Sequence, residues 1–150
     1  MTDARSPVLR AICGPTGAGK SALALRLAER VGAAILSADS RQLYRGFDVG
    51  TAKPTAAERA RVPHFGVDVA DPRERWSAAR WADDCARWID EAAARGRAPL
   101  LVGGTGFYLR ALAEPLFAEP PLDAARRRAL EPVLATLPLD ELRRWAAALD

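Results

Sequence analysis

Short apolar runs alternate along the chain with longer segments in which apolar residues recur every three or four positions. The runs cover Val8–Cys13, Ala34–Leu36, Phe65–Val69 and Pro99–Val102. Runs of this length without regular polar alternation are typical of strands whose two faces are both buried in a parallel sheet. We therefore predict four buried parallel strands with helices on both faces of the sheet, which is an α/β fold.

The segments between these runs carry start and stop signals of helices. Thr55 and Glu58 form a capping-box pattern, and Ser77 can cap a long helix. Glycines at positions 32 and 96 can end the helices that precede them. The predicted helices cover Ser21–Val31, a short stretch from Thr55, Ser77 to about Arg95, Phe107–Ala113, a stretch from Asp123, and Asp140–Leu149.

A change in composition divides the chain. Three prolines fall within Glu114–Leu122, which is typical of a linker or a turn between subdomains. We predict an α/β core over residues 1–113 and the start of a helical insertion over residues 114–150.

Composition excludes several classes of protein. Hydrophobic residues make up 49% of the chain and charged residues 27%, so it is neither disordered nor collagen-like. No run of eighteen apolar residues is present, and the N-terminus lacks an apolar signal core, so we expect a cytoplasmic protein with no membrane contact. The net charge of +3 permits a nucleic-acid partner without requiring one.

Single residues that could carry chemistry are few. Cys13 and Cys85 follow no disulfide or metal-binding pattern, and we expect both to be buried thiols in a reducing compartment. Trp81 and Trp88 share one helical face with Cys85, which favours core packing. The one histidine, His64, leaves little material for a histidine metal site or a Ser-His-Asp triad, and we expect it to pack structurally.

A glycine-rich segment after the first apolar run matches G-x-x-x-x-G-K-[ST] at every fixed position, between a predicted strand and a predicted helix. Glycines let backbone N–H groups surround phosphate oxygens, and the helix N-terminus adds partial positive charge. The chain has two lysines, Lys20 and Lys53. Lys20 lies in this segment and supplies a point charge, and Ser21 can ligate Mg²⁺. The predicted diphosphate or ATP site consists of Gly14, Pro15, Thr16, Gly17, Ala18, Gly19, Lys20 and Ser21.

The rest of the chain narrows the reaction class. The sequence contains no Asn, which excludes the N-K-x-D motif of GTPases. The fourth apolar run ends in Gly103-Gly104-Thr105 rather than in an acidic residue. The one strand-end acid next to the loop is Asp39, which favours a transferase over a motor or switch NTPase. We predict a P-loop NTPase-like parallel sheet flanked by helices.

A second polar, glycine-punctuated segment spans Asp39–Pro54 and reads D-S-R-Q-L-Y-R-G-F-D-V-G-T-A-K-P. It closely resembles a motif of the tRNA dimethylallyltransferases, also called tRNA isopentenyltransferases. The segments G-P-T-G-A-G-K-S and L-L-V-G-G-T-G-F-Y resemble two further motifs of that family, in the same order. The resemblance extends from Ala11 to the end of the chain. Family members are considerably longer, so we expect this chain to correspond to their N-terminal half.

The resemblance implies a reaction. The family transfers a dimethylallyl group from dimethylallyl diphosphate to N6 of adenosine 37 in tRNAs that read codons beginning with U. Gly14–Ser21 would hold the donor diphosphate with Mg²⁺, and the catalytic residues would be Lys20, Asp39 as general base, and Thr105. Asp39 and Thr105 have structural alternatives, as a turn cap and a helix N-cap. The residues expected to contact tRNA are Asp39, Ser40, Arg41, Gln42, Thr105 and Arg127.

Alternatives remain open at this point. A P-loop small-molecule kinase would use the arginines at positions 126–128 in a lid, but it leaves Asp39–Pro54 unexplained. An adenylate isopentenyltransferase would keep the chemistry and change the acceptor. A remnant that binds tRNA or phosphate without turnover is the non-enzymatic reading. We expect a monomer.

Overall fold

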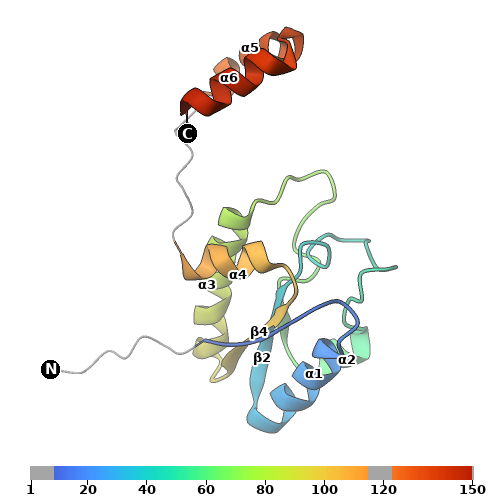
Figure 1. Ribbon diagram of the computed structural model, residues 1–150. Coiled ribbons are helices and arrows are strands. Elements are labelled where there is room, and N and C mark those ends of the chain that lie inside the picture. The colour runs from blue at the N-terminus through green and yellow to red at the C-terminus, as the bar shows by residue number, and fades with distance from the viewer. Residues whose placement is uncertain (1–8, 115–122, 150) are drawn as a thin grey trace, which may run out of the picture. The chain divides into compact units, whose positions relative to one another are not determined.

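The computed structural model describes residues 9–114 and 123–149 (Figure 1). The chain divides into two compact units, Met1–Leu116 and Phe117–Asp150. The first is an α/β unit and the second contains two helices. Within the described ranges, no helix has the length and apolar character needed to cross a membrane.

The first unit is built on a parallel four-stranded sheet, with strands in the order β1-β4-β2-β3. The α/β fold predicted from the apolar runs is confirmed. In chain order the elements are β1 (Arg10–Cys13), α1 (Lys20–Val31), β2 (Ala33–Ala38), α2 (Ala56–Arg61), β3 (His64–Phe65), α3 (Ala78–Ala94), β4 (Ala98–Gly103) and α4 (Gly106–Ala113).

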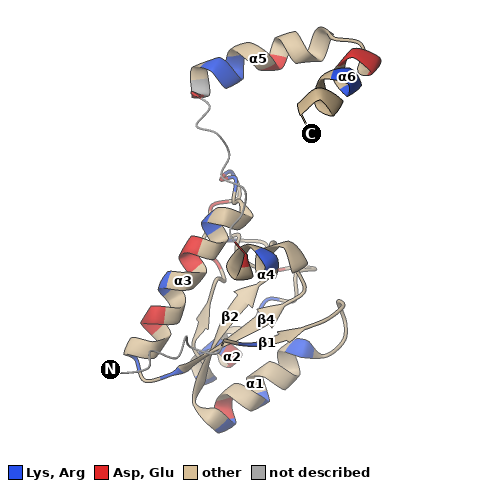
Figure 2. Ribbon diagram, turned by 60° about the vertical axis from the view of Figure 1, so that its left-hand side comes forward, with Lys and Arg blue, Asp and Glu red and all other residues tan. Residues whose placement is uncertain are grey.

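Helices cover both faces of this sheet. α1 packs against β2 and β4 on one face, while α3 and α4 pack together on the other (Figure 1). Side chains alternate along the strands, so Ile35 and Leu100 join the α1 core while Leu36 and Leu101 join the α3–α4 core. Basic and acidic residues are interspersed along α3 (Figure 2). These charged residues alternate with residues that α3 buries in the core, such as Trp81 and Cys85. This amphipathic pattern explains why α3 forms where its sequence period predicts a helix.

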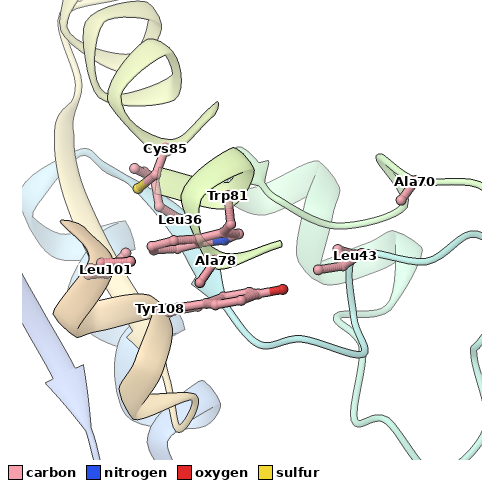
Figure 3. Close-up of a cluster of buried hydrophobic side chains, with 10 residues drawn as sticks. Leu36, Leu43, Ala70, Ala78, Trp81, Cys85, Leu101 and Tyr108 are labelled. Atoms are coloured by element: carbon pink, nitrogen blue, oxygen red, sulfur yellow. The ribbon is translucent and has the colours of Figure 1, made fainter. Parts of the chain in front are cut away.

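The centre of the α3–α4 core is an aromatic stack (Figure 3). The rings of Trp81 and Tyr108 lie with their centroids 4.7 Å apart and their planes at 17°. The indole Nε1 of Trp81 donates to the carbonyl of Ser37, 3.1 Å away, which ties α3 to β2. Trp81 and Cys85 are both fully buried, and Trp88 packs against the same cluster, so the predicted core face of α3 is confirmed.

The expectation for the first strand is wrong in part. Val8 lies outside the described residues, and β1 begins at Arg10. Cys13 is exposed rather than buried. Among the described strands, β1 pairs with β4 alone, so its other side has no covering strand. An apolar run therefore predicts a strand correctly without determining its place in the sheet.

The third strand is shorter than the predicted Phe65–Val69. It ends at Phe65 because Gly66 and Asp68 have φ of +74° and +56°, which extended strands do not accommodate. A Cβ on Gly66 would lie 2.9 Å from the ring of Trp88 and 3.0 Å from the carbonyl oxygen of Ser37. Glycine is therefore required at position 66 for both its conformation and its close contacts.

The second unit contains α5 (Ala124–Thr136) and α6 (Leu139–Leu149). Asp123 caps α5, as predicted, by accepting a hydrogen bond from the amide of Ala125 at 2.8 Å. Arg126–Arg128 form the basic band near the start of α5 (Figure 2). Several large apolar side chains of these helices are exposed, namely Leu130, Val133, Leu139, Trp145 and Leu149.

Candidate active site

The carboxyl ends of three neighbouring strands meet at one edge of the sheet. Cys13 and Ala38 both pair with Gly103, so β1, β4 and β2 end in the same row. The segments that follow them line one cavity of about 950 Å³. Ligands of parallel α/β sheets bind at this edge, and the polar residues predicted for the site are gathered here.

The Gly14–Ser21 loop forms one wall of the cavity. Gly14, Gly17 and Gly19 have φ of +150°, +83° and +79°, a backbone path that residues with a Cβ rarely adopt. Seven of the eight predicted residues line the cavity; Ala18 does not. The loop leads directly into α1, whose N-terminus carries partial positive charge. This wall can therefore accommodate an anion.

Lys20 begins α1 and folds back over the loop. Its Nζ donates to the carbonyl of Pro15, 2.7 Å away, and the side chain lines the cavity. One of its three protons is thus engaged by the loop itself. The geometry keeps the ammonium group beside the space that the glycine backbone surrounds.

Asp39 follows β2 and faces the same cavity. Its Oδ1 accepts hydrogen bonds from the amides of Arg41, at 2.8 Å, and Gln42, at 3.3 Å. The turn-capping role considered for Asp39 is therefore present. No described residue donates to its second oxygen, Oδ2, so one carboxylate oxygen can interact with a ligand.

Thr105 connects the ends of β2 and β4. Its hydroxyl accepts a hydrogen bond from the amide of Ser40 at 3.2 Å, and its own amide donates to the carbonyl of Ala38 at 3.2 Å. Thr105 occupies the N-cap position of α4, but its side chain makes no capping hydrogen bond to that helix. The hydroxyl thus links the segment after β4 to the segment after β2 at the cavity. The expected N-cap hydrogen bond is not observed.

The side chains of Ser40, Arg41 and Gln42 also line the cavity, but they differ in freedom. Ser40 and Arg41 are exposed. The amide of Gln42 is engaged at both ends: its Oε1 accepts from Ser37 Oγ at 2.9 Å, and its Nε2 donates to the carbonyls of Thr51, at 3.1 Å, and Ala52, at 3.0 Å. Gln42 therefore supports the cavity wall more than it presents a free group to a ligand.

The structure adds residues that the motifs did not single out. Glu58 and His64 also line the cavity. The ring Nδ1 of His64 lies 2.7 Å from the carbonyl of Val62, so this nitrogen carries the proton. Burial, together with the charge of Arg59, lowers the pKa of His64, and the ring is neutral near pH 7. The capping-box pattern identifies Glu58 in the sequence, but only the fold brings it to the cavity.

Tyr108, in the α3–α4 core, is an unusually weak acid. Burial raises the pKa of its phenol to about 12, with smaller contributions from Tyr44 and Asp39. The phenol therefore stays neutral at physiological pH. Its ring stacks on that of Trp81 within the α3–α4 core.

A magnesium ion at this site would need ligands from a substrate as well as from the protein. Within residues 9–114 and 123–149, no group of three or more His, Cys, Asp or Glu side chains could hold a metal. Ser21 nevertheless lines the cavity and offers a hydroxyl. Mg²⁺ commonly binds through one or two protein oxygens, phosphate oxygens and water, so this donor fits an ion that arrives with a diphosphate.

Comparisons with known proteins agree with this arrangement. The IPP transferase family model matches residues 42–150, and the isopentenyl transferase family model matches residues 7–63. The chain belongs to the IPP transferase family. The family expected from the sequence motifs is thereby confirmed.

Two curated relatives of the IPP transferase family carry the name tRNA dimethylallyltransferase. The protein of Anaeromyxobacter sp. (strain Fw109-5) is 57% identical over 123 residues, which are 82% of this chain and 41% of the relative. That of Geobacter metallireducens is 46% identical over 150 residues, which are 100% of this chain and 48% of the relative. The chain thus spans less than half the length of these relatives.

A crystal structure shows the same relation to the family. The full-length tRNA isopentenylpyrophosphate transferase of Bacillus halodurans is 39% identical and superposes with a TM-score of 0.70. The match covers 95% of this chain and 47% of that one. At this identity the likeness supports both the α/β fold and the family.

One predicted site residue belongs to the other unit of the chain. Arg127 belongs to α5, in the second unit, where it is exposed. The structure therefore brings together the predicted residues of the first unit, apart from Ala18, and the role of Arg127 stays a prediction.

Proposed function

We propose that this protein transfers a dimethylallyl group from dimethylallyl diphosphate to N6 of adenosine 37 in tRNAs that read codons beginning with U. The observation that carries the proposal is a single cavity. The glycine loop with Lys20 forms one wall, and Asp39 and Thr105 lie at the adjoining strand ends. Donor diphosphate and acceptor adenine could meet in that space. The names of the relatives supply the substrate class.

On the donor side, the Gly14–Ser21 loop would bind the diphosphate. Backbone amides and the N-terminus of α1 would face its oxygens, and Lys20 would neutralise charge that grows as diphosphate leaves. Ser21, with phosphate oxygens, would hold Mg²⁺, which supplies further charge neutralisation when bound. A compact ammonium suits this place because it can approach oxygens from several directions.

On the acceptor side, Asp39 would act as the general base. The lone pair of N6 attacks C1 of the dimethylallyl group while the bond from C1 to the diphosphate oxygen breaks, with its electron pair leaving on diphosphate. One N6 proton passes to the carboxylate of Asp39, whose Oδ2 has no hydrogen-bond donor among the described residues. General bases placed in this way contribute about 10²–10⁴-fold to rate. Thr105, joined to Ser40, would sit between diphosphate and adenine.

The RNA interface would extend from the cavity. An adenine in a folded loop must leave its stack to reach Asp39. Ser40 and Arg41 are exposed at the cavity and could contact the flipped nucleotide, supported by Gln42. Arg127, on the second unit, would contact the RNA backbone. Because the proposed substrate is tRNA, we place the protein in the cytoplasm.

A labelling experiment tests the proposal. The purified chain is incubated with radiolabelled dimethylallyl diphosphate, Mg²⁺, and either unmodified tRNA or AMP. Label on tRNA, at the adenosine next to the anticodon, supports the proposal. Label on AMP alone would replace it with an adenylate isopentenyltransferase. Phosphoryl transfer from ATP without any prenyl transfer would replace it with a kinase, and binding of tRNA without turnover would identify a non-catalytic protein.

A further inference from the structure

Lys53 is a buried lysine whose three protons all have acceptors. Its side chain is 4% exposed. Nζ lies 2.6 Å from the carbonyl oxygen of Tyr44, 2.9 Å from Oδ1 of Asp48 and 2.6 Å from Oδ1 of Asp68. An ammonium group has three donors, so none is left for a ligand. Although Lys53 lines the cavity with its stem, it is not a second phosphate-binding lysine.

Asp68 extends this contact into a network. Its second oxygen, Oδ2, accepts from Arg59 of α2 at 2.7 Å, and Arg59 Nε donates to the carbonyl of Pro54 at 3.1 Å. Asp68 holds a left-handed conformation, with φ of +56°, which is uncommon for a residue with a Cβ. We call Lys53, Asp48, Asp68 and Arg59 the Lys53 network. It joins the segment 44–53 to α2 and to the chain that follows β3.

The charges of the network support one another. Burial by itself would lower the pKa of Lys53, but the hydrogen bonds that Lys53 donates to Asp48 and Asp68 outweigh it and leave the pKa raised. For Asp68, burial acts to raise the pKa, and hydrogen bonds from Lys53 and Arg59 outweigh it and leave the pKa lowered. Both groups are therefore charged across the physiological range, and the contact does not depend on pH there.

The end of the segment 44–53 lines the same cavity as the glycine loop. Gly50, Thr51 and Ala52 line the cavity, and the side-chain amide of Gln42 donates to the carbonyls of Thr51 and Ala52. The Lys53 network holds the same segment at the carbonyl of Tyr44 and at Asp48. Among the described residues, no hydrogen bond or ion pair joins this network to Gly14–Ser21. Its influence should therefore fall on one wall of the cavity and leave the other unchanged.

We propose that Lys53 is a positioning residue that fixes the acceptor-side wall of the cavity. This inference rests on the proposed function for the identity of the acceptor, but the positioning itself does not. Three acceptors surround one nitrogen, which a compact ammonium satisfies. A guanidinium spreads its donors over a planar fork and cannot place three on these atoms. This accounts for lysine at one of the two places where a chain rich in arginine contains it.

The test compares three variants of the full chain with the unaltered protein. Lys53→Met removes the charge and keeps the length, Lys53→Arg keeps the charge, and Asp48→Asn removes the charge of only the exposed partner, whose side chain is 71% exposed. Arg61→Met is the matched control. Arg61 lies on α2, as Arg59 does, but it makes an exposed ion pair with Glu29 and no contact with the network. The measurements are thermal unfolding, amide hydrogen exchange, binding of Mg²⁺-pyrophosphate, and steady-state transfer to an RNA hairpin.

We expect the loss of Lys53 to affect the segment 44–53 and transfer to RNA, and to leave the glycine loop and pyrophosphate binding unchanged. In Lys53→Met, amides of residues 46–52 exchange faster while those of α1 and α3 do not, and pyrophosphate affinity is unchanged. The kcat/KM for the RNA acceptor falls by about 10²-fold, the typical cost of misplacing a reacting group by ~1 Å. Lys53→Arg behaves like Lys53→Met, Asp48→Asn lies between, and Arg61→Met matches the unaltered chain.

Other outcomes overturn the proposal. Equal losses of pyrophosphate and RNA affinity would make Lys53 a general structural residue, and full rescue by arginine would show that charge alone suffices. Unchanged exchange over residues 46–52 would show that Lys53 does not hold this wall. If the unaltered chain transfers no prenyl group, the proposed function fails, but hydrogen exchange and pyrophosphate binding still decide the positioning role. If Lys53→Met does not fold, Asp48→Asn supplies the same comparison.

Discussion

Asp39 combines two tasks that a carboxylate can perform with separate oxygens. Oδ1 caps the turn after β2, and Oδ2 has no donor among the described residues. The capping interpretation and the catalytic interpretation of this residue are therefore compatible. The local structure needs an acceptor at Oδ1, whereas only the proposed reaction needs a base.

A substitution separates these tasks. Asp39→Asn keeps an oxygen for the amides of Arg41 and Gln42 but cannot take a proton, so the fold and pyrophosphate binding should be unchanged. The rate of prenyl transfer in a single turnover should fall by about 10²–10⁴-fold. Asp90→Asn, at an exposed position on α3, is the control and should match the unaltered chain. A transfer rate that survives in Asp39→Asn would remove Asp39 as the general base.

At the scale of elements, the site depends on how closely β2 approaches β4. Gly103 pairs with Ala38 in the last row of the two strands, and a Cβ at position 103 would clash with the Ala38 backbone. Glycine here is therefore a packing requirement, since its backbone is in an ordinary strand. Asp39 and Gly104-Thr105 are the next residues of each chain segment, so this close approach also sets the width of the site.

Gly103→Ala should destabilise the first unit. Forcing an extra methyl group into close-packed structure typically costs about 1–3 kcal/mol, and here the obstacle is backbone rather than a flexible side chain. Gly106→Ala is the control, because a Cβ there meets nothing within 4 Å and the residue begins α4. That change should leave the unfolding free energy unchanged or raise it by about 0.4–1 kcal/mol. Urea unfolding of both variants measures the difference, and equal stabilities would contradict the clash.

Sequence patterns predicted most elements, and the exceptions have physical causes. Helix caps at Thr55, Ser77 and Asp123 are local hydrogen bonds, and the structure contains all three. The third strand was predicted too long because the pattern does not show that Gly66 and Asp68 adopt positive φ. Cys13 was predicted buried because an apolar run does not indicate whether its strand has one neighbour or two.

In the site, too, the sequence predicts contacts between neighbouring residues better than contacts between residues far apart in the chain. The Gly14–Ser21 loop and Asp39 stand in motifs that are contiguous in sequence, so spacing alone locates them at strand ends. The partners of Lys53 are up to fifteen residues away, and they meet only because Asp68 takes an unusual backbone conformation. His64 likewise lines the cavity only because the fold places β3, the short strand that it begins, beside this site. No local pattern encodes such contacts.

At the scale of the whole molecule, the first unit holds the cavity, and the second carries one of the predicted RNA contacts, Arg127. Arg127 is exposed on α5 and belongs to the second unit, whereas Lys20 and Asp39 belong to the first. If it contacts an RNA phosphate, its effect should depend on salt, because binding releases counterions. A residue of the cavity would instead affect the chemical step.

Arg127→Ala should therefore weaken binding of an RNA hairpin and reduce the slope of log affinity against log salt by about one unit, the change expected for one lost phosphate contact. Pyrophosphate affinity should be unchanged, because the diphosphate loop lies in the first unit. Arg144→Ala, at an exposed position on α6, removes an equal charge from the same unit and serves as the control. Fluorescence anisotropy of the labelled hairpin at several salt concentrations measures both slopes. If the two arginine variants bind alike, Arg127 contributes only its share of net charge, and the predicted contact is wrong.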